Sequence, residues 1–153
     1  QIVIAGSAAA VARAGERARA LGAKRVIPLQ VSAPFHCALM RPAEERLAPE
    51  LRAVKARDPR VPVVANVDAS PKTDAVSSID ALIRQVSAPV RWEDCVRRLA
   101  SAGVTAYVEV GPGTVLSGLV KKIAREAVIL NLDAPEGLAP IEALAAASGG
   151  AHA

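Results

Sequence analysis

The chain has 153 residues, of which 52% are hydrophobic and 22% are charged, a composition that excludes an intrinsically disordered protein and fits one domain or a piece of a larger one. Its net charge of +4 comes without a long basic run, and aromatic residues make up only 2%, which argues against nucleic-acid binding by base stacking. The two cysteines exclude a disulfide framework, and no apolar run reaches the roughly 18 residues of a membrane span, so we expect a cytoplasmic protein with no nucleic-acid or membrane partner.

The N-terminal part of the sequence predicts two strands with one helix between them. Residues 2–5 form a short apolar run typical of a buried strand, and Ser7 is suited to cap the helix that follows. Apolar residues then recur at helical spacing as far as Gly22, the expected end of this helix. Residues 25–32 are typical of a second strand, which Pro28 restricts to a sheet edge or a kink.

Helices and strands continue to alternate along the rest of the chain. In order, the patterns predict a helix opening at Pro42, a strand at 61–67, a helix at 79–86, a helix from Trp92 that stops by Gly103, a strand at 104–110, a helix at 114–126 and a strand at 128–132. Beyond Pro135 the chain is rich in alanine and glycine, which favours a weak helix and a frayed tail. The alternation indicates an α/β fold with a largely parallel sheet.

His36 is the first candidate for chemistry, because it lies in a loop directly after a predicted strand, where α/β proteins bind ligands. Its unperturbed pKa of about 6.5 suits a general base, but a histidine can equally cap a loop by hydrogen bonding. Cys37 beside it is either a nucleophile or, as most free cysteines are, a small buried hydrophobe. No Gly-x-Ser-x-Gly elbow is present, and no second ligand pair stands at metal-binding spacing, so we predict no metal site.

The sequence Glu-Val-Gly-Pro-Gly at residues 109–113 leads from a predicted strand into a predicted helix. Backbone amides at such a turn can hold an anion, although neither a P-loop nor the third glycine of a dinucleotide fingerprint follows. The alternative is a tight turn that lets the following helix pack on the sheet. The residues leave both interpretations open.

Three motifs in the same order resemble malonyl-CoA:acyl carrier protein transacylase, and acyltransferase domains of polyketide synthases share parts of the pattern. They are Ser-Ala-Pro-Phe-His-Cys-Ala-Leu-Met at 32–40, Gln-Val-Ser-Ala-Pro-Val-Arg-Trp at 85–92, and Glu-Val-Gly-Pro-Gly at 109–113 with the leucines that follow it. The resemblance extends from Gln1 to about Asp133, which is most of the chain.

The resemblance implies a partial hydrolase-like acyltransferase subdomain with a remnant of a ferredoxin-like small subdomain. Residues 1–30 would be the ferredoxin-like remnant, residues 31–135 the C-terminal part of the α/β acyltransferase subdomain, and residues 136–153 a weakly ordered tail. The family's serine elbow and the arginine that pairs with the malonyl carboxylate would both precede Gln1. We therefore expect a C-terminal fragment that cannot form the acyl-enzyme by itself.

The resemblance also implies a reaction, namely transfer of a malonyl group from malonyl-CoA to the phosphopantetheine thiol of acyl carrier protein in fatty acid biosynthesis, through a serine acyl-enzyme and without a cofactor. His36 matches the catalytic histidine, the general base, and Gln85 matches the residue whose main-chain carbonyl orients its ring. Gln1 and Phe35 match positions that line the acyl pocket, and Asn66 is expected to approach it. A phenylalanine before the histidine accompanies malonyl rather than methylmalonyl specificity in such acyltransferases.

Three other interpretations stay open on the sequence. The chain could come from an acyltransferase domain of a polyketide synthase, with the same chemistry. It could instead be a non-catalytic binding module of the same fold, or a nucleotide-binding α/β domain that uses the turn at 111–113.

Overall fold

A computed structural model describes residues 2–149 of the chain, so the predicted pocket residue Gln1 and the last four residues lie outside the described part. The elements are α1 (Ala8–Ala20), η1 (Ala38–Met40), α2 (Arg41–Ala53), β1 (Val63–Val64), β2 (Pro71–Lys72), α3 (Ala75–Arg84), α4 (Trp92–Ser101), β3 (Ala106–Val110), α5 (Val115–Ile123), β4 (Val128–Leu132), η2 (Pro135–Gly137) and α6 (Leu138–Gly149). Helices with two small sheets confirm the α/β class. The chain forms two compact units, which divide between Arg91 and Trp92. The subdomain boundaries implied by the resemblance stay a prediction.

Helix α1 forms where the sequence predicts it and has the predicted cap. The Ser7 side chain accepts a hydrogen bond from the amide of Ala10 at 3.4 Å, which satisfies one of the free amides of the first turn. After the helix, Gly22 adopts a φ of 92°, in the left-handed region that favours glycine. The amide of Ala23 then bonds back to the carbonyl of Ala18 at 2.9 Å, which ends the helix.

The strands predicted at 2–5 and 25–32 do not form. Both segments are irregular, and neither belongs to the sheets found within the described residues, which consist of β1 with β2 and β3 with β4. Their large apolar side chains stay exposed, with Ile2 at 94% and Val31 at 62%. A strand requires the edge of another strand, and neither segment pairs with one within the described residues.

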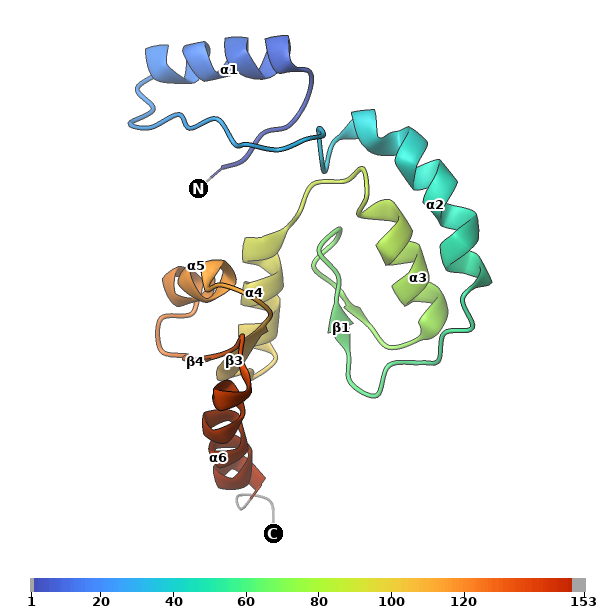
Figure 1. Cartoon of the computed structure of the whole chain (residues 1–153), viewed down its shortest axis with the longest axis vertical. Helices are drawn as coiled ribbons and strands as arrows, with labels where there is room; N and C mark the ends of the chain where they lie inside the picture. Colours follow the sequence, from blue (N-terminus) through green and yellow to red (C-terminus); the bar gives the residue numbers. More distant parts are fainter. Residues whose placement is uncertain (1, 150–153) are drawn as a thin grey trace. The chain divides into compact units, whose positions relative to one another are not determined.

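Helices α2 and α3 pack side by side in the first unit and bury Ala48, Ala81 and Ile83 (Figure 1). The strand predicted at 61–67 shortens to β1, which pairs antiparallel with β2. It ends there because the chain turns back at residues 65–69, where Ala69 has a φ of 55° and donates its amide to the carbonyl of Ala65 at 2.8 Å. This hairpin is absent from the sequence prediction.

The second unit contains the parallel pair that the alternating pattern predicts. Strands β3 and β4 run parallel from the Ala106–Val128 pair onward, with α5 as the connection between them and packed against both (Figure 1). Helix α4 packs on α5, and the core of this unit is formed by Cys95, Val96 and Val120. Strand β4 has the predicted bounds.

The region predicted as a weakly ordered tail contains η2 and α6 within its described part. Gly137 at the end of η2 lies tightly against the preceding strand, since a Cβ atom there would be only 2.5 Å from the carbonyl oxygen of Asn131. Only glycine fits this approach without a shift of the backbone. No helix within residues 2–149 combines the length and the apolar character needed to cross a membrane.

Candidate active site

His36 has an unusual backbone conformation. Its φ is 57°, in the left-handed region that few residues other than glycine adopt, although histidine is found there more often than most. Such a conformation costs on the order of 1 kcal/mol or more and is found most often at functional sites. The imidazole lies in the loop before η1 and is exposed.

The ring of His36 is held by the main chain of a residue 49 positions away. Its Nδ1 lies 3.1 Å from the carbonyl oxygen of Gln85. Gln85 is the C-cap of α3, and the last carbonyls of a helix have no partner within the helix, so this oxygen is free to accept a hydrogen bond. When Nδ1 carries the proton and donates it here, Nε2 is left as the acceptor.

The two neighbours of His36 differ in their surroundings. Phe35 is 46% exposed, so its ring is available to a ligand on this surface. Cys37 is half-buried, and its Sγ donates to the carbonyl of Pro34 at 3.1 Å. That contact ties the thiol to its own loop and agrees with a structural cysteine rather than a nucleophile.

Asn66 lies in the half-buried turn between β1 and β2. Its main-chain carbonyl accepts a hydrogen bond from the amide of Arg91 at 2.8 Å. The structure thus links Asn66 to the end of the loop that begins at Gln85, and its role in an acyl pocket stays a prediction.

The loop at residues 85–91 is fixed at several points. The amide of Val86 bonds to the carbonyl of Ile83 at 3.3 Å. The hydroxyl of Ser87 donates to the carboxylate of Glu44 on α2, the helix that follows the His36 loop. Sequence reasoning missed Glu44 because nothing local connects two residues that are 43 positions apart.

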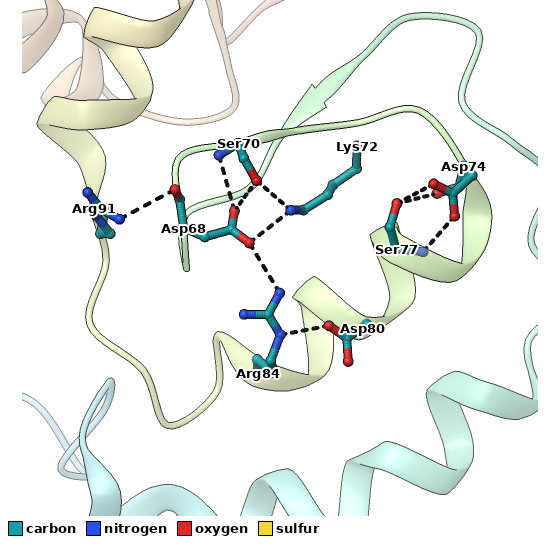
Figure 2. Close-up of polar contacts among 8 residues, drawn as sticks. All are labelled: Asp68, Ser70, Lys72, Asp74, Ser77, Asp80, Arg84 and Arg91. Atoms are coloured by element: carbon teal, nitrogen blue, oxygen red, sulfur yellow. Dashed lines mark hydrogen bonds and ion pairs between the residues drawn. The ribbon is translucent and has the colours of Figure 1, made fainter.

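A charged cluster around Asp68 joins this loop to the hairpin (Figure 2). Asp68 accepts from Lys72 at 2.8 Å and from Arg84 at 3.1 Å, and Arg84 also donates to Asp80 at 2.7 Å. The hydrogen bond from Lys72, followed by those from Ser70 and Arg84, holds the pKa of Asp68 well below its usual range. Asp80 and Arg84 are four residues apart on a predicted helix, a spacing that could have indicated this part of the cluster from the sequence.

A side chain of the second unit occupies amides of the first turn of α5, shortly after the turn at 111–113. The carboxylate of Glu109 accepts from the amides of Leu116 and Ser117 at 3.1 and 2.7 Å, and from Asn131 Nδ2 at 3.3 Å. Hydrogen bonds from Ser117, from the Leu116 amide and from Asn131 lower the pKa of Glu109. Because this carboxylate occupies amides at the start of α5, the geometry favours a turn that packs a helix on a sheet over an anion-binding turn.

The second unit offers little space for a ligand. One cavity of about 100 Å³ lies between β3, β4, α4 and α5, and another of about 260 Å³ is lined by residues of 100–105 and 124–127; both are below the roughly 300–1,000 Å³ of typical ligand pockets. Among the described residues, no three side chains of His, Cys, Asp or Glu are gathered as they would be around a metal ion.

No family model matches the chain. It is 49% identical over 138 residues to the malonyl CoA-acyl carrier protein transacylase of Salmonella typhimurium, which covers 90% of this chain and 45% of the relative. The crystal structure of an acyl-carrier-protein S-malonyltransferase from Burkholderia pseudomallei matches with a TM-score of 0.84 and 42% identity, covering 89% of this chain and 44% of that one.

A further structure shows a type II polyketide synthase acyl-carrier protein in complex with its malonyl-transacylase. It matches with a TM-score of 0.82 and 42% identity, covering 87% of this chain and 43% of that one. The chain therefore spans somewhat less than half the length of the relatives that it matches. By sequence and by fold, the chain is similar to part of the malonyl CoA-acyl carrier protein transacylases.

Proposed function

We propose that the protein containing this chain transfers a malonyl group from malonyl-CoA to the phosphopantetheine thiol of acyl carrier protein, and that this chain supplies the general base. The observation that carries the proposal is the 3.1 Å contact between His36 Nδ1 and the Gln85 carbonyl. It leaves Nε2 of an exposed imidazole ready to take a proton. The names of the relatives supply the substrate and the acceptor.

In the first half-reaction, a serine from outside this sequence gives its hydroxyl proton to His36 Nε2 as its oxygen attacks the thioester carbon. The tetrahedral intermediate then collapses and the C–S bond breaks. The proton on Nε2 passes to the departing CoA thiolate. The products are free CoA and a malonyl-serine ester, and His36 is neutral again.

The second half-reaction repeats these steps in reverse order. His36 Nε2 takes the proton of the phosphopantetheine thiol, whose sulfur attacks the malonyl-serine ester. The C–O bond breaks, and Nε2 returns the proton to the serine oxygen. Through both steps the Gln85 carbonyl keeps the ring in one tautomer, and a neutral acceptor suffices here because a thioester is an activated substrate.

We assign the expected pocket residues to the same site. Phe35 would occupy the space that the α-methyl group of methylmalonyl needs, a discrimination of about 1–3 kcal/mol per methyl. Its exposed ring beside His36 supports this role. Gln1 and Asn66 are proposed to line the acyl pocket, and the proposal includes fatty acid biosynthesis as the pathway and the cytoplasm as the location.

The finer fold assignment also belongs to this proposal. Residues 1–30 would be a remnant of a ferredoxin-like subdomain, and residues 31–135 part of a hydrolase-like subdomain. In support, the apolar side chains of the segments that fail to form strands are exposed, with Ile4 at 53% and Leu29 at 56%. In the proposed subdomain, strands from outside the described residues would cover these side chains.

The test is malonyl transfer by the complete protein with His36 replaced. His36→Ala should lower kcat by about 100-fold to 10,000-fold, the usual contribution of a general base. His36→Asn is the matched variant, because asparagine tolerates the left-handed backbone but cannot act as the base. Equal losses in both variants would assign the effect to the missing base, whereas transfer at the wild-type rate in either would reject the proposal.

A polyketide pathway is the second candidate, favoured by the relative that is complexed with a type II polyketide synthase carrier protein. Comparing kcat/KM for carrier proteins of fatty acid and polyketide synthases separates the two pathways. The binding-module alternative predicts that the complete wild-type protein binds carrier protein and transfers nothing.

A further inference from the structure

The loop at residues 85–91 has to present one carbonyl to His36 in a fixed direction. A hydrogen bond of 3.1 Å is lost once its atoms move apart by about half an ångström, and misplacement by 1 Å can cost about 100-fold in rate. The loop is half-buried to exposed and belongs to no strand. Contacts at its ends, together with the hydrogen bond of Ser87 to Glu44, therefore set the position of the Gln85 carbonyl.

The side chain of Asp68 holds the first end of this loop. Its Oδ2 accepts from Arg84 Nη2 at 3.1 Å, and Arg84 directly precedes Gln85. Arg84 is further fixed by Asp80, which accepts from its Nε at 2.7 Å. The Arg84 guanidinium is thus hydrogen-bonded both to its own helix and to the hairpin, as Figure 2 shows.

The same residue contacts the second end of the loop. Arg91 Nη1 donates to the main-chain carbonyl of Asp68 at 3.4 Å, and the Arg91 amide donates to the neighbouring Asn66 carbonyl at 2.8 Å. The turn at 66–68 therefore receives hydrogen bonds from both ends of the loop.

Asp68 is itself firmly held. Its Oδ1 accepts from the amide and the hydroxyl of Ser70 at 3.1 and 2.8 Å, and its Oδ2 accepts from Lys72 at 2.8 Å. The Lys72 side chain is 11% exposed, so this ion pair is shielded from solvent far better than a surface pair. The Lys72 pair is therefore the shielded part of the cluster, whereas the Arg84 and Asp80 side chains are 43% and 56% exposed.

We propose that Asp68 is a positioning residue for His36, because it fixes both ends of the loop whose Gln85 carbonyl orients the imidazole. The inference rests on the proposed function of His36 as the base. Asp68 touches neither substrate nor the reacting atoms, and it acts through Arg84 and Gln85.

Asp68→Asn in the complete protein tests this role, since it removes the charge that Arg84 and Lys72 require while keeping the shape. We expect kcat for malonyl transfer to fall about tenfold with KM for malonyl-CoA changed by less than about twofold. Nitrogen-15 NMR of labelled histidine provides the direct readout. The Nδ1–H tautomer of His36 should lose population in the variant, which loss of stability alone would not cause.

Two further substitutions make the result specific. Lys72→Met loosens the same carboxylate without touching the loop, so it should shift the tautomer of His36 in the same direction as Asp68→Asn but by less. Glu93→Gln breaks the ion pair of Glu93 with Arg97, which has the same four-residue spacing in the second unit, and should change neither kcat nor tautomer.

The outcomes separate the two proposals. An inactive His36→Ala together with a fully active Asp68→Asn of unchanged tautomer would overturn the positioning role and leave the base in place. An active His36→Ala would overturn the base itself. If Asp68→Asn fails to fold, Arg84→Gln replaces it, with the same fall in kcat expected, and unchanged kcat and tautomer in that variant would equally overturn the role of the cluster.

Discussion

His36 Nδ1 contacts the carbonyl oxygen of Gln85 at 3.1 Å, and the side chain of Gln85 has no part in this contact. Substitution of Gln85 should therefore matter less than a change in the direction of its carbonyl. Gln85→Ala is expected to keep kcat within about threefold of wild type.

Val86→Pro is the matched substitution, and it should change the direction of the Gln85 carbonyl. Gln85 has a ψ of −17°, a helical value that a following proline disfavours, and the proline also removes the bond from Val86 to Ile83. We expect kcat to fall by about 100-fold while far-UV circular dichroism still shows a folded protein. A larger loss in Gln85→Ala than in Val86→Pro would contradict orientation by the main chain.

The capping carboxylate of Glu109 predicts a pH dependence of stability in the second unit. Its pKa is lowered in the folded protein, so it stabilises the fold above the unfolded glutamate pKa of about 4.3 and this contribution disappears as the pH falls through the folded pKa. Glu109→Gln should lower the melting temperature at pH 7 and flatten its decline between about pH 5 and pH 3.

The exposed Glu126 provides the control for this measurement. Glu126→Gln should reproduce the wild-type curve of melting temperature against pH. A wild-type curve in Glu109→Gln as well would show that the carboxylate does not stabilise α5.

Gly137 and Gly118 form a matched pair for testing the packing of the second unit. A Cβ at Gly137 would lie 2.5 Å from the Asn131 carbonyl, whereas a Cβ at Gly118 would meet nothing within 4 Å. Gly137→Ala should destabilise the protein by about 1–3 kcal/mol. Gly118→Ala, inside α5, should stabilise it by about 0.5–1 kcal/mol. Thermal unfolding measures both, and shifts of the same sign would contradict the structure.

Phe35 predicts the choice of acyl group. Phe35→Ser should raise the ratio of methylmalonyl to malonyl transfer by about tenfold, the lower end of what one methyl group is worth in a pocket. Competition between the two CoA thioesters measures this ratio. Cys37→Ser, on the other side of His36, should leave it unchanged, and an equal change in both variants would remove Phe35 as the determinant.

The sequence predicted those elements that local signals define. Helix α4 begins at Trp92 as expected, and β4 has its predicted bounds, because amphipathic spacing and a β-branched run bounded by turn residues are local features. Helix α3 starts four residues before the predicted Ile79, since Asp74 caps it by accepting from the Ser77 amide at 2.8 Å. That cap could have been recognised from the sequence.

Features that depend on distant partners could not be predicted from single segments. Residues 2–5 have the composition of a strand, yet strand formation is decided by a neighbouring edge and not by composition. The ion pair of Asp68 with Arg84 likewise joins a turn to a helix end 16 residues later. The pairing of His36 with Gln85 was expected only through the family resemblance, because no periodicity connects a loop to a helix cap 49 residues away.

The Gln85 carbonyl that contacts the His36 imidazole is uncharged. In the proposed reaction, anionic substrates approach this imidazole. A carboxylate in place of the Gln85 carbonyl would repel a substrate anion at 4 Å by about 1 kcal/mol in water and by about 4 kcal/mol near a protein surface. The peptide oxygen carries no net charge at any pH, and no side-chain substitution deletes it. The neutral Gln85 carbonyl therefore orients His36 without repelling a negatively charged acyl donor.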